Sequence, residues 1–309
     1  MFAVALAVAA IPEALSSIVT IVLAIGTQKL SKENAIVKKL KSVESLGCVG
    51  VICSDKTGTL TQNKMTVKKV YISEKVLDTS GLDKDNKIDK LILQESILCN
   101  DATNDVGDPT EIALVNLADK YGIDFKELKH TYPRISEIPF DSDRKLMSTV
   151  HKIDNDIIMF TKGAVDSLVP RITHILINNE VREIKKEDIK KIEETNNLFA
   201  ETGLRVLTYA YKILNSEKEI SLEDENNYIF IGLVGMIDPP RAESKAAVEK
   251  CIMAGIKPVM ITGDHKVTAR TIAREIGIYH EGDRVIEGLE LEKMTDEELK
   301  AQVERTSVY

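Results

Sequence analysis

The heptapeptide Asp55–Thr61 (DKTGTLT) constrains the fold most strongly, because it lies at the end of a run of apolar, mostly β-branched residues over 49–53. Such a run predicts a buried parallel strand whose carboxyl end delivers Asp55 to a loop. Gly58 lets the loop backbone approach an anion, and the hydroxyls of Thr57 and Thr59 can donate to phosphoryl oxygens. A carboxylate placed there is suited to attack a phosphate group. The sequence therefore predicts an α/β fold with a phosphate site at the end of a strand.

Length, charge and cysteine usage narrow the class of protein. A chain of 309 residues can bury more than one hydrophobic core, so we expect two soluble domains. The net charge of −8 argues against a general nucleic-acid binder, which needs a basic face. The cysteines share no metal-ligand spacing and are predicted to be reduced, small apolar residues of a cytosolic protein. They are Cys48, Cys53, Cys99 and Cys251.

The first 25 residues differ most from a soluble composition. Residues 2–25 contain one acid, Glu13, and no base, over a length sufficient to cross a bilayer. We predict a transmembrane helix over residues 1–27 that contacts membrane lipid. Lysines from Lys29 to Lys41 place its end on the cytoplasmic side, with the soluble domains. A signal peptide fits poorly because its charges precede the apolar stretch, whereas a buried soluble helix is the other alternative.

Pro12 and Glu13 lie inside this apolar stretch. Proline removes a helical hydrogen bond and frees carbonyl oxygens, and a carboxylate within a membrane is costly unless it meets a cation or a donor. Together they predict an oxygen-lined break in a helix at membrane depth. Transporters coordinate ions at such breaks, so Glu13 is a candidate ligand of a transported cation.

The heptapeptide resembles the phosphorylation motif of P-type cation-transporting ATPases, a branch of the haloacid dehalogenase-like (HAD-like) phosphotransferases. The resemblance implies a HAD-like doubly wound parallel sheet that carries a large inserted α+β nucleotide-binding domain and follows a transmembrane helix. It also implies that Asp55 attacks the γ-phosphate of ATP and becomes an aspartyl-phosphate. Soluble phosphatases of the superfamily carry a second Asp where this chain has Thr57, so the intermediate should persist.

Residues 8–15 resemble the fourth transmembrane helix of the calcium-type (type II) pumps of this family. The resemblance implies that Glu13 binds the transported ion. Oxygen ligands suit Ca²⁺ or Mn²⁺. Ala14 and Ser16 stand where animal calcium pumps commonly carry Gly and Pro, which leaves the choice of ion open.

Strand and turn patterns divide the rest of the chain. We predict a linker and the first part of a phosphorylation domain over 28–63, a nucleotide-binding domain over 64–235, and a truncated second part over 236–309. The boundary at 236 falls at the end of a predicted strand over 228–237, after which Pro239 and Pro240 mark a boundary or hinge. A second strand, over 257–261, leads to a turn and a helix over 267–276. The predicted catalytic residues come from the two loops: Asp55, Lys56, Thr57, Thr262, Gly263 and Asp264.

Several short motifs between the two loops resemble the ATP-binding domain of the same pumps. Lys162 and Gly163 follow a predicted strand over 156–161, and Phe140 resembles the phenylalanine that stacks on adenine. Glu111 has two readings, since it can complete a capping box at Asp108 or belong to the adenosine pocket. The resemblance implies that the following residues bind ATP: Glu111, Phe140, Lys145, Lys162, Gly163 and Arg205.

Phosphoryl transfer also requires Mg²⁺, for which Asp55 and the Thr57 carbonyl are candidate ligands. The remaining ligand of the family belongs to a T-G-D-G-x-N-D segment that does not follow Asp264. We therefore expect this chain to bind ATP but to be incomplete for catalysis. We also expect its incomplete sheet to expose an edge that can pair with another copy. The alternatives are a soluble HAD-superfamily phosphatase and a non-catalytic nucleotide-binding module.

Overall fold

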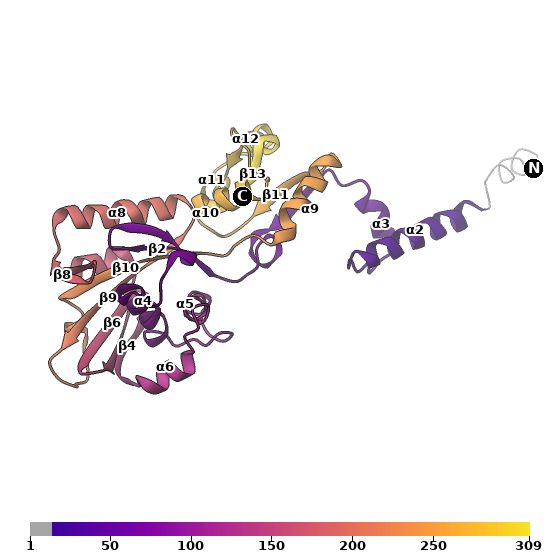
Figure 1. Ribbon diagram of the computed structural model, residues 1–309. Helices are drawn as coiled ribbons and strands as arrows, with labels where there is room; N and C mark the ends of the chain where they lie inside the picture. Colours follow the sequence, from indigo (N-terminus) through magenta and orange to yellow (C-terminus); the bar gives the residue numbers. More distant parts are fainter. Residues whose placement is uncertain (1–13) are drawn as a thin grey trace, which may run out of the picture. The chain divides into compact units, whose positions relative to one another are not determined.

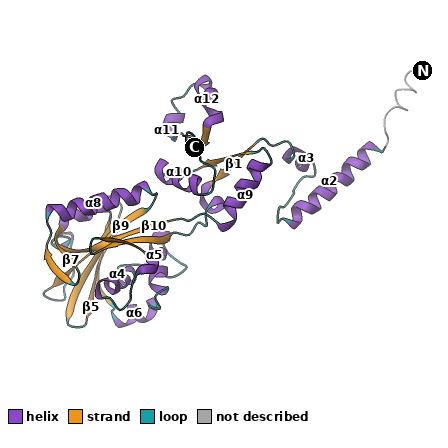
Figure 2. Cartoon of the chain, turned by 45° about the horizontal axis from the view of Figure 1, so that its top comes forward, coloured by secondary structure: helices purple, strands orange, loops and turns teal. Residues whose placement is uncertain are grey.

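The computed structural model describes residues 14–309, which fall into two compact units (Figures 1 and 2). One unit contains the residues up to Cys53 together with Lys250–Pro258, and the other contains Ser54–Glu249 and Val259–Tyr309. Each unit is described by itself. The predicted strands over 228–237 and 257–261 are confirmed as β10 (Tyr228–Ile237) and β11 (Lys257–Ile261).

The first unit begins with helix α2 (Leu15–Lys32), followed by α3 (Lys41–Leu46). Lys29 and Lys32 lie in the last turn of α2, where positive charge complements the helix dipole. This explains why the helix continues to Lys32 instead of ending near residue 27. Among residues 14–309, no helix is both long enough and apolar enough to cross a membrane. The predicted cation ligand Glu13 and the first part of the predicted span, residues 1–13, lie outside the described residues.

The larger unit is built on a nine-stranded sheet, in which β10 pairs antiparallel with β2 and β9 and parallel with β7. The main path runs in the order β3-β2-β10-β9-β6-β5-β4, and β8 pairs with β7. The other strands are β2 (Thr66–Ile72), β3 (Lys75–Asp78), β4 (Arg134–Asp141), β5 (Leu146–Ile153), β6 (Asp156–Gly163), β7 (Ile172–Ile177), β8 (Glu180–Glu183) and β9 (Arg205–Leu214).

Helices cover both faces of this sheet (Figure 2). One face packs against α4 (Lys87–Leu98), α5 (Pro109–Asp119) and α6 (Phe125–Thr131). The other face packs against α7 (Val165–Leu168) and α8 (Lys186–Glu201). Because β10 is buried on both faces, it reads as a nearly continuous apolar run instead of an alternating pattern.

A smaller four-stranded sheet has the order β1-β11-β13-β12, and β13 pairs parallel with both β11 and β12. Its core contains residues of helices α9 and α10. Its remaining elements are β1 (Val51–Asp55), α9 (Ala242–Met253), α10 (Lys266–Glu275), β12 (Arg284–Val285), α11 (Gly288–Leu291), α12 (Asp296–Gln302) and β13 (Thr306–Val308). The fold is thus mixed α/β, with parallel and antiparallel pairing.

The strand before Asp55 was predicted to be buried, but its side chains are largely exposed and it occupies other residues than predicted. The strand occupies Val51–Asp55 instead of 49–53, and Val51 and Ile52 are 52% and 38% exposed. The physical reason is position, since β1 lies at the end of the strand order and has one neighbouring strand. An edge strand covers fewer of its own side chains than a central one does.

Candidate active site

Asp55 ends β1 and begins a tight loop. Its carboxylate accepts a hydrogen bond from the Thr57 backbone N–H at 3.3 Å. Gly58 has φ +73°, a left-handed conformation that glycine adopts without strain. The loop closes where the Thr61 N–H donates to the Lys56 carbonyl at 3.0 Å. This turn leaves the Asp55 carboxylate exposed at the end of the strand, as a nucleophile requires.

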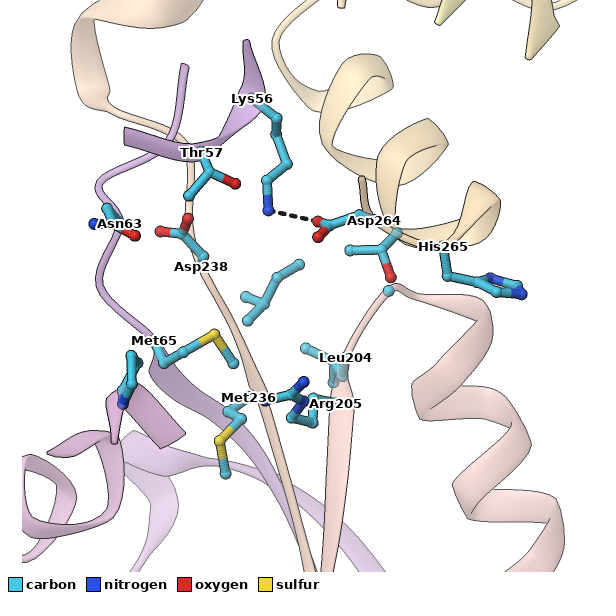
Figure 3. A pocket seen from close by; sticks show the side chains of 14 residues that line it. Lys56, Thr57, Asn63, Met65, Leu204, Arg205, Met236, Asp238, Asp264 and His265 are labelled. Carbon is cyan, nitrogen blue, oxygen red and sulfur yellow. Dashed lines mark hydrogen bonds and ion pairs between the residues drawn. The ribbon is translucent and has the colours of Figure 1, made fainter. Parts of the chain in front are cut away.

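The second loop, predicted from Thr262, Gly263 and Asp264, comes to the same place. The Thr262 hydroxyl accepts the Asp264 N–H at 3.1 Å, which orders the turn before α10. Lys56 is almost buried, and its ammonium forms an ion pair with Asp264 at 2.5 Å (Figure 3). The structure therefore brings the two predicted loops together through their charged residues.

Asp238 and Arg241 flank the two prolines that the sequence marks as a boundary or hinge, and sequence reasoning missed their part in this site. The Asp238 carboxylate lies 2.5 Å from the Thr61 hydroxyl and accepts the Lys64 N–H at 3.0 Å. Arg241 donates to the Gly58 carbonyl at 2.9 Å. Both hold the loop after Asp55 against the segment that follows β10. The available signal was the pair of charged residues flanking Pro239 and Pro240 at the end of a buried strand.

A cavity of about 490 Å³ opens beside these loops (Figure 3). Lys56, Thr57 and Asp264 line it on one side, and Arg205 and Met236 line it on the other. Its volume lies within the range of about 300 to 1,000 Å³ that small-molecule sites occupy. Cationic and anionic groups both face this space, so a phosphorylated ligand would find charge partners there.

The predicted Mg²⁺ ligands fit the ion only in part. Mg²⁺ prefers about six oxygen ligands in octahedral geometry, and the predicted set offers the Asp55 carboxylate and the Thr57 carbonyl. Among residues 14–309, no cluster of three or more His, Cys, Asp or Glu side chains is arranged to hold a metal. The remaining oxygens would therefore come from water and from the phosphates of the ligand.

A second cavity, of about 560 Å³, brings together all six residues predicted to bind nucleotide. Arg205 lines this cavity and the first one as well. The two spaces therefore share a guanidinium. The predicted residues that line the second cavity are Glu111, Phe140, Lys145, Lys162, Gly163 and Arg205.

Glu111 and Lys162 form an ion pair of 2.7 Å in this cavity, and their side chains are 17% and 6% exposed. The second oxygen of Glu111 accepts the Asp101 N–H at 3.3 Å. Asp108 caps α5 through the Thr110 N–H at 2.8 Å, as predicted. Glu111 does not complete a capping box, because its carboxylate is engaged by Lys162 and by Asp101. Glu111 lines the second cavity, and its place in an adenosine pocket stays a prediction.

The turn between β4 and β5 contributes Lys145 to the rim of the cavity. Lys145 has φ +57° and its ammonium pairs with Asp166 at 2.9 Å. This hydrogen bond lowers the pKa of the Asp166 carboxyl below its ordinary value.

Lys162 and Gly163 were predicted to follow a strand, but they form the end of β6, because pairing with β5 and β9 continues to Gly163.

Phe140 and Arg205 occupy positions suited to a ligand. Phe140 is 63% exposed at the cavity, which is unusual for a large aromatic ring that serves only packing. Arg205 begins β9 and donates to the Thr110 hydroxyl at 3.0 Å. The cavity thus offers an aromatic face, a buried ammonium and a guanidinium, which together match a base, a sugar and a chain of phosphates.

Comparison with known proteins agrees with this arrangement. The family described as P-type ATPase, cytoplasmic domain N, matches residues 89–243, about half of the chain. Calcium-transporting ATPase 1 of Lactococcus lactis is 46% identical over 319 residues, covering 100% of this chain and 36% of that protein. Calcium-transporting ATPase 1 of Bacillus cereus is 47% identical over 313 residues, covering 100% of this chain and 35% of that protein.

A calcium-transporting ATPase of Listeria monocytogenes is 46% identical over 317 residues, covering 100% of this chain and 36% of that protein. The chain therefore spans just over a third of the length of these relatives. The matched region, 89–243, includes all six residues of the second cavity that were predicted from sequence to bind nucleotide. The chain belongs to the P-type ATPases, and it carries their cytoplasmic domain N.

Proposed function

We propose that the chain is the central part of an ATP-driven cation pump that stores the energy of ATP as an aspartyl-phosphate on Asp55. The observation that carries the proposal is the pair of neighbouring cavities that share Arg205. One cavity lies beside the loop after Asp55, and the other contains an exposed aromatic ring and a buried ammonium. A single ATP molecule needs an aromatic surface for its base and a site beside Asp55 for its γ-phosphate.

In the proposed reaction, adenine stacks on Phe140 while Lys162 and Arg205 hold the polar part of the nucleotide. An Asp55 carboxylate oxygen attacks the γ-phosphorus, a new O–P bond forms, and the bond to the β,γ-bridging oxygen breaks. ADP leaves with that electron pair. The Thr57 side chain lacks a carboxylate that could activate water, so the acyl-phosphate survives long enough for the protein to change shape.

Mg²⁺ enters as part of the MgATP substrate and neutralises charge on the phosphates. Asp55 and the Thr57 carbonyl are its proposed protein ligands. Lys56 and Asp264 pair in this structure at 2.5 Å. We propose that a bound phosphoryl group competes with Asp264 for the Lys56 ammonium, which places that charge beside the transferring group.

The proposed cargo is Ca²⁺, with Mn²⁺ as the alternative. Relatives that match the whole chain are named calcium-transporting ATPases. We propose that Glu13 is a ligand of the transported ion in a membrane segment within residues 2–25. The pump would then be a membrane protein with the domains described above in the cytoplasm.

We further propose that the four-stranded sheet is part of a HAD-like phosphorylation domain, formed by 28–63 and 236–309. The nine-stranded sheet would be the nucleotide-binding domain inserted over 64–235. The parallel pairing of β11, β13 and β12 supports the first assignment. The second is supported by the nucleotide cavity and by the family match over 89–243.

Acid-quenched labelling with γ-labelled ATP tests the proposed function in the whole pump. We expect a hydroxylamine-sensitive label that depends on Ca²⁺ and disappears in Asp55→Asn, whereas a label that requires Mn²⁺ would identify that ion. The chain alone should bind ATP without accumulating label. Label that persists in Asp55→Asn would overturn the role of Asp55, and rapid phosphate-ester hydrolysis by the chain alone would favour a soluble phosphatase.

A further inference from the structure

A buried glutamate, Glu225, forms the centre of a polar cluster that the proposed reaction does not use. It lies in the loop between β9 and β10, and its side chain is fully buried. Its carboxylate pairs with the Arg144 guanidinium at 2.5 Å and accepts a hydrogen bond from the Ser148 hydroxyl at 2.7 Å. Arg171, just before β7, pairs with the carboxylate at 3.6 Å and donates to the Glu225 carbonyl at 2.9 Å. These partners are held in place, because breaking a contact leaves a charge unpaired away from water.

Arg144 connects this carboxylate to the turn between β4 and β5. One guanidinium nitrogen of Arg144 pairs with Glu225, and the other donates to the Pro139 carbonyl at 2.5 Å. The peptide group that contains this carbonyl leads directly into Phe140. The Arg144 backbone N–H also donates to the Asp141 carboxylate at 2.8 Å, which closes the turn. A carboxylate from a distant segment of the chain therefore fixes the backbone next to the aromatic ring.

The ring of Phe140 depends on such support because little of it is packed. The residue is largely exposed, so few contacts with the core orient the ring. The described residues that line the second cavity include Phe140 and Lys145 from this turn, but neither Arg144 nor Glu225. Glu225 can thus act on a ligand only through the turn that it holds.

We propose that Glu225 is a positioning residue for recognition of the base, and that it acts through Arg144 on Phe140. The buried carboxylate fixes the guanidinium, and the guanidinium fixes the Pro139 carbonyl, so the ring is presented at the cavity before a base arrives. A surface ordered in advance loses less conformational entropy when the ligand binds. Recognition of the phosphates belongs to other residues and does not depend on Glu225. The inference rests on the proposed function, because it assumes that the second cavity binds ATP.

Titration calorimetry of the chain with ATP and with inorganic tripolyphosphate separates the base from the phosphates. Glu225→Gln keeps the shape of the side chain but removes its charge. We expect the Kd for ATP to rise about tenfold, within the contribution of a stacked base, and the Kd for tripolyphosphate to stay unchanged. Arg144→Lys should give the same pattern. Its single ammonium keeps the charge beside Glu225 but cannot reproduce the fork that also reaches the Pro139 carbonyl.

A spectroscopic measurement tests the action through the turn directly. The chain contains no tryptophan, so Phe140→Trp places a single tryptophan fluorophore at the position of the ring. Without ligand, we expect the fluorescence anisotropy of this tryptophan to fall when Glu225→Gln is added, because the turn gains freedom. An unchanged anisotropy would overturn the proposed action on the turn, even if the Kd for ATP rises.

Glu217→Gln is the matched control, because Glu217 lies in the same loop and also pairs with β5, through the exposed Lys152 at 3.2 Å. This variant should bind both ligands like the unchanged chain. If Glu225→Gln also binds ATP like the unchanged chain, the role of Glu225 is overturned although the nucleotide site stands. Equal weakening of ATP and tripolyphosphate would show a general structural effect and overturn the role as well. If the unchanged chain does not bind ATP, the proposed nucleotide site fails, and the inference fails with it.

Discussion

At the residue scale, the nucleotide cavity combines two side chains with opposite surroundings. Phe140 is 63% exposed, so its ring contributes little to the core and is available to a ligand. Lys162 is almost buried, and its charge is compensated by Glu111 at 2.7 Å. A buried ammonium keeps its position and interacts strongly with an incoming anion, because little water screens it. In the proposed function, the exposed ring would recognise the base and the buried charge would recognise the phosphates.

Gly163 is a position at which the addition of a single methyl group should have a large structural effect. A Cβ atom there would lie 2.4 Å from both the Lys145 carbonyl oxygen and a methyl group of Leu146. We expect Gly163→Ala to lower the free energy of unfolding by about 1 to 3 kcal/mol, as overpacked sites do. It should also weaken ATP binding, because the turn that carries Lys145 must move. Urea unfolding and ATP titration measure the two effects.

Gly81→Ala is the matched control for this substitution, since a Cβ atom at Gly81 meets no heavy atom within 4 Å. That variant should change stability by less than about 0.5 kcal/mol, like most surface substitutions. Equal stabilities of the two alanine variants would show that the close approach at Gly163 is not a constraint.

At the element scale, α8 shows how a long surface helix is held at its start. Asp188 accepts two hydrogen bonds of 2.7 Å from the Arg182 guanidinium and a third from the Lys185 N–H at 2.8 Å. The Arg182 hydrogen bonds are the largest cause that lowers the pKa of Asp188, which falls to about 2. One carboxylate thus joins strand β8 to the first turn of α8, where negative charge also complements the helix dipole.

We expect Asp188→Asn to lower the free energy of unfolding at pH 7 by about 1 kcal/mol. The value is reduced for solvent screening because Arg182 is 38% exposed. A carboxyl whose pKa is depressed in the folded state stabilises above its unfolded pKa of 3.8. That contribution is lost as the pH falls through 3.8 toward about 2, so the difference between variant and parent should shrink in that window.

Urea unfolding at pH 7 and near pH 3 measures this dependence. Glu187→Gln is the control, because Glu187 lies in the same first turn but makes no ion pair or side-chain hydrogen bond among those found in residues 14–309. A loss of stability in Asp188→Asn that is the same at both pH values would contradict the linkage.

At the scale of the whole molecule, two crossing segments run side by side between the small and the large sheet. The Gln62 N–H donates to the Pro239 carbonyl at 3.1 Å, and the Arg241 N–H donates to the Leu60 carbonyl at 2.9 Å. Asp238 adds its bonds to Thr61 and Lys64. These bonds join the segment after Asp55 to the segment after β10.

The edge strand β1 makes self-association an expected property of this chain. Ile52 and Val51 are exposed on a strand that has one neighbour, and such edges pair with other copies. We expect the average molar mass in sedimentation equilibrium to rise with protein concentration. Ile52→Lys should raise the concentration at which this happens by about tenfold, which corresponds to about 1.4 kcal/mol.

Leu222→Lys is the control for a general effect of added charge. Leu222 is 63% exposed and lies outside both sheets. This variant should associate like the unchanged chain. If both lysine variants behave alike, or if the unchanged chain stays monomeric at high concentration, association through β1 is excluded.

Local patterns explain which parts of the structure could be predicted from sequence. A strand such as β10 is recognisable because it is buried on both faces and therefore continuously apolar. The six nucleotide residues were predicted because each lies in a short motif of its own, and the structure places all six around one cavity.

Other features depended on contacts between distant segments. Asp238 binds Thr61 across more than 170 positions of sequence, so no local pattern identifies it as part of the site. Glu95 looks like an ordinary polar residue on a helix, and only its burial against β6 and β9 makes it unusual. The exposure of β1 follows from its place at the edge of the sheet, which a run of apolar residues does not encode.

The sequence by itself determined the α/β character, the nucleophile candidate Asp55 and its loop, because turn chemistry and apolar runs act over a few residues. Tertiary structure alone decided that Lys56 pairs with Asp264, that Arg205 lines both cavities and that Lys162 pairs with Glu111. Charge pairing and burial depend on distances in space, and chain folding brings together residues whose separation in sequence carries no such information.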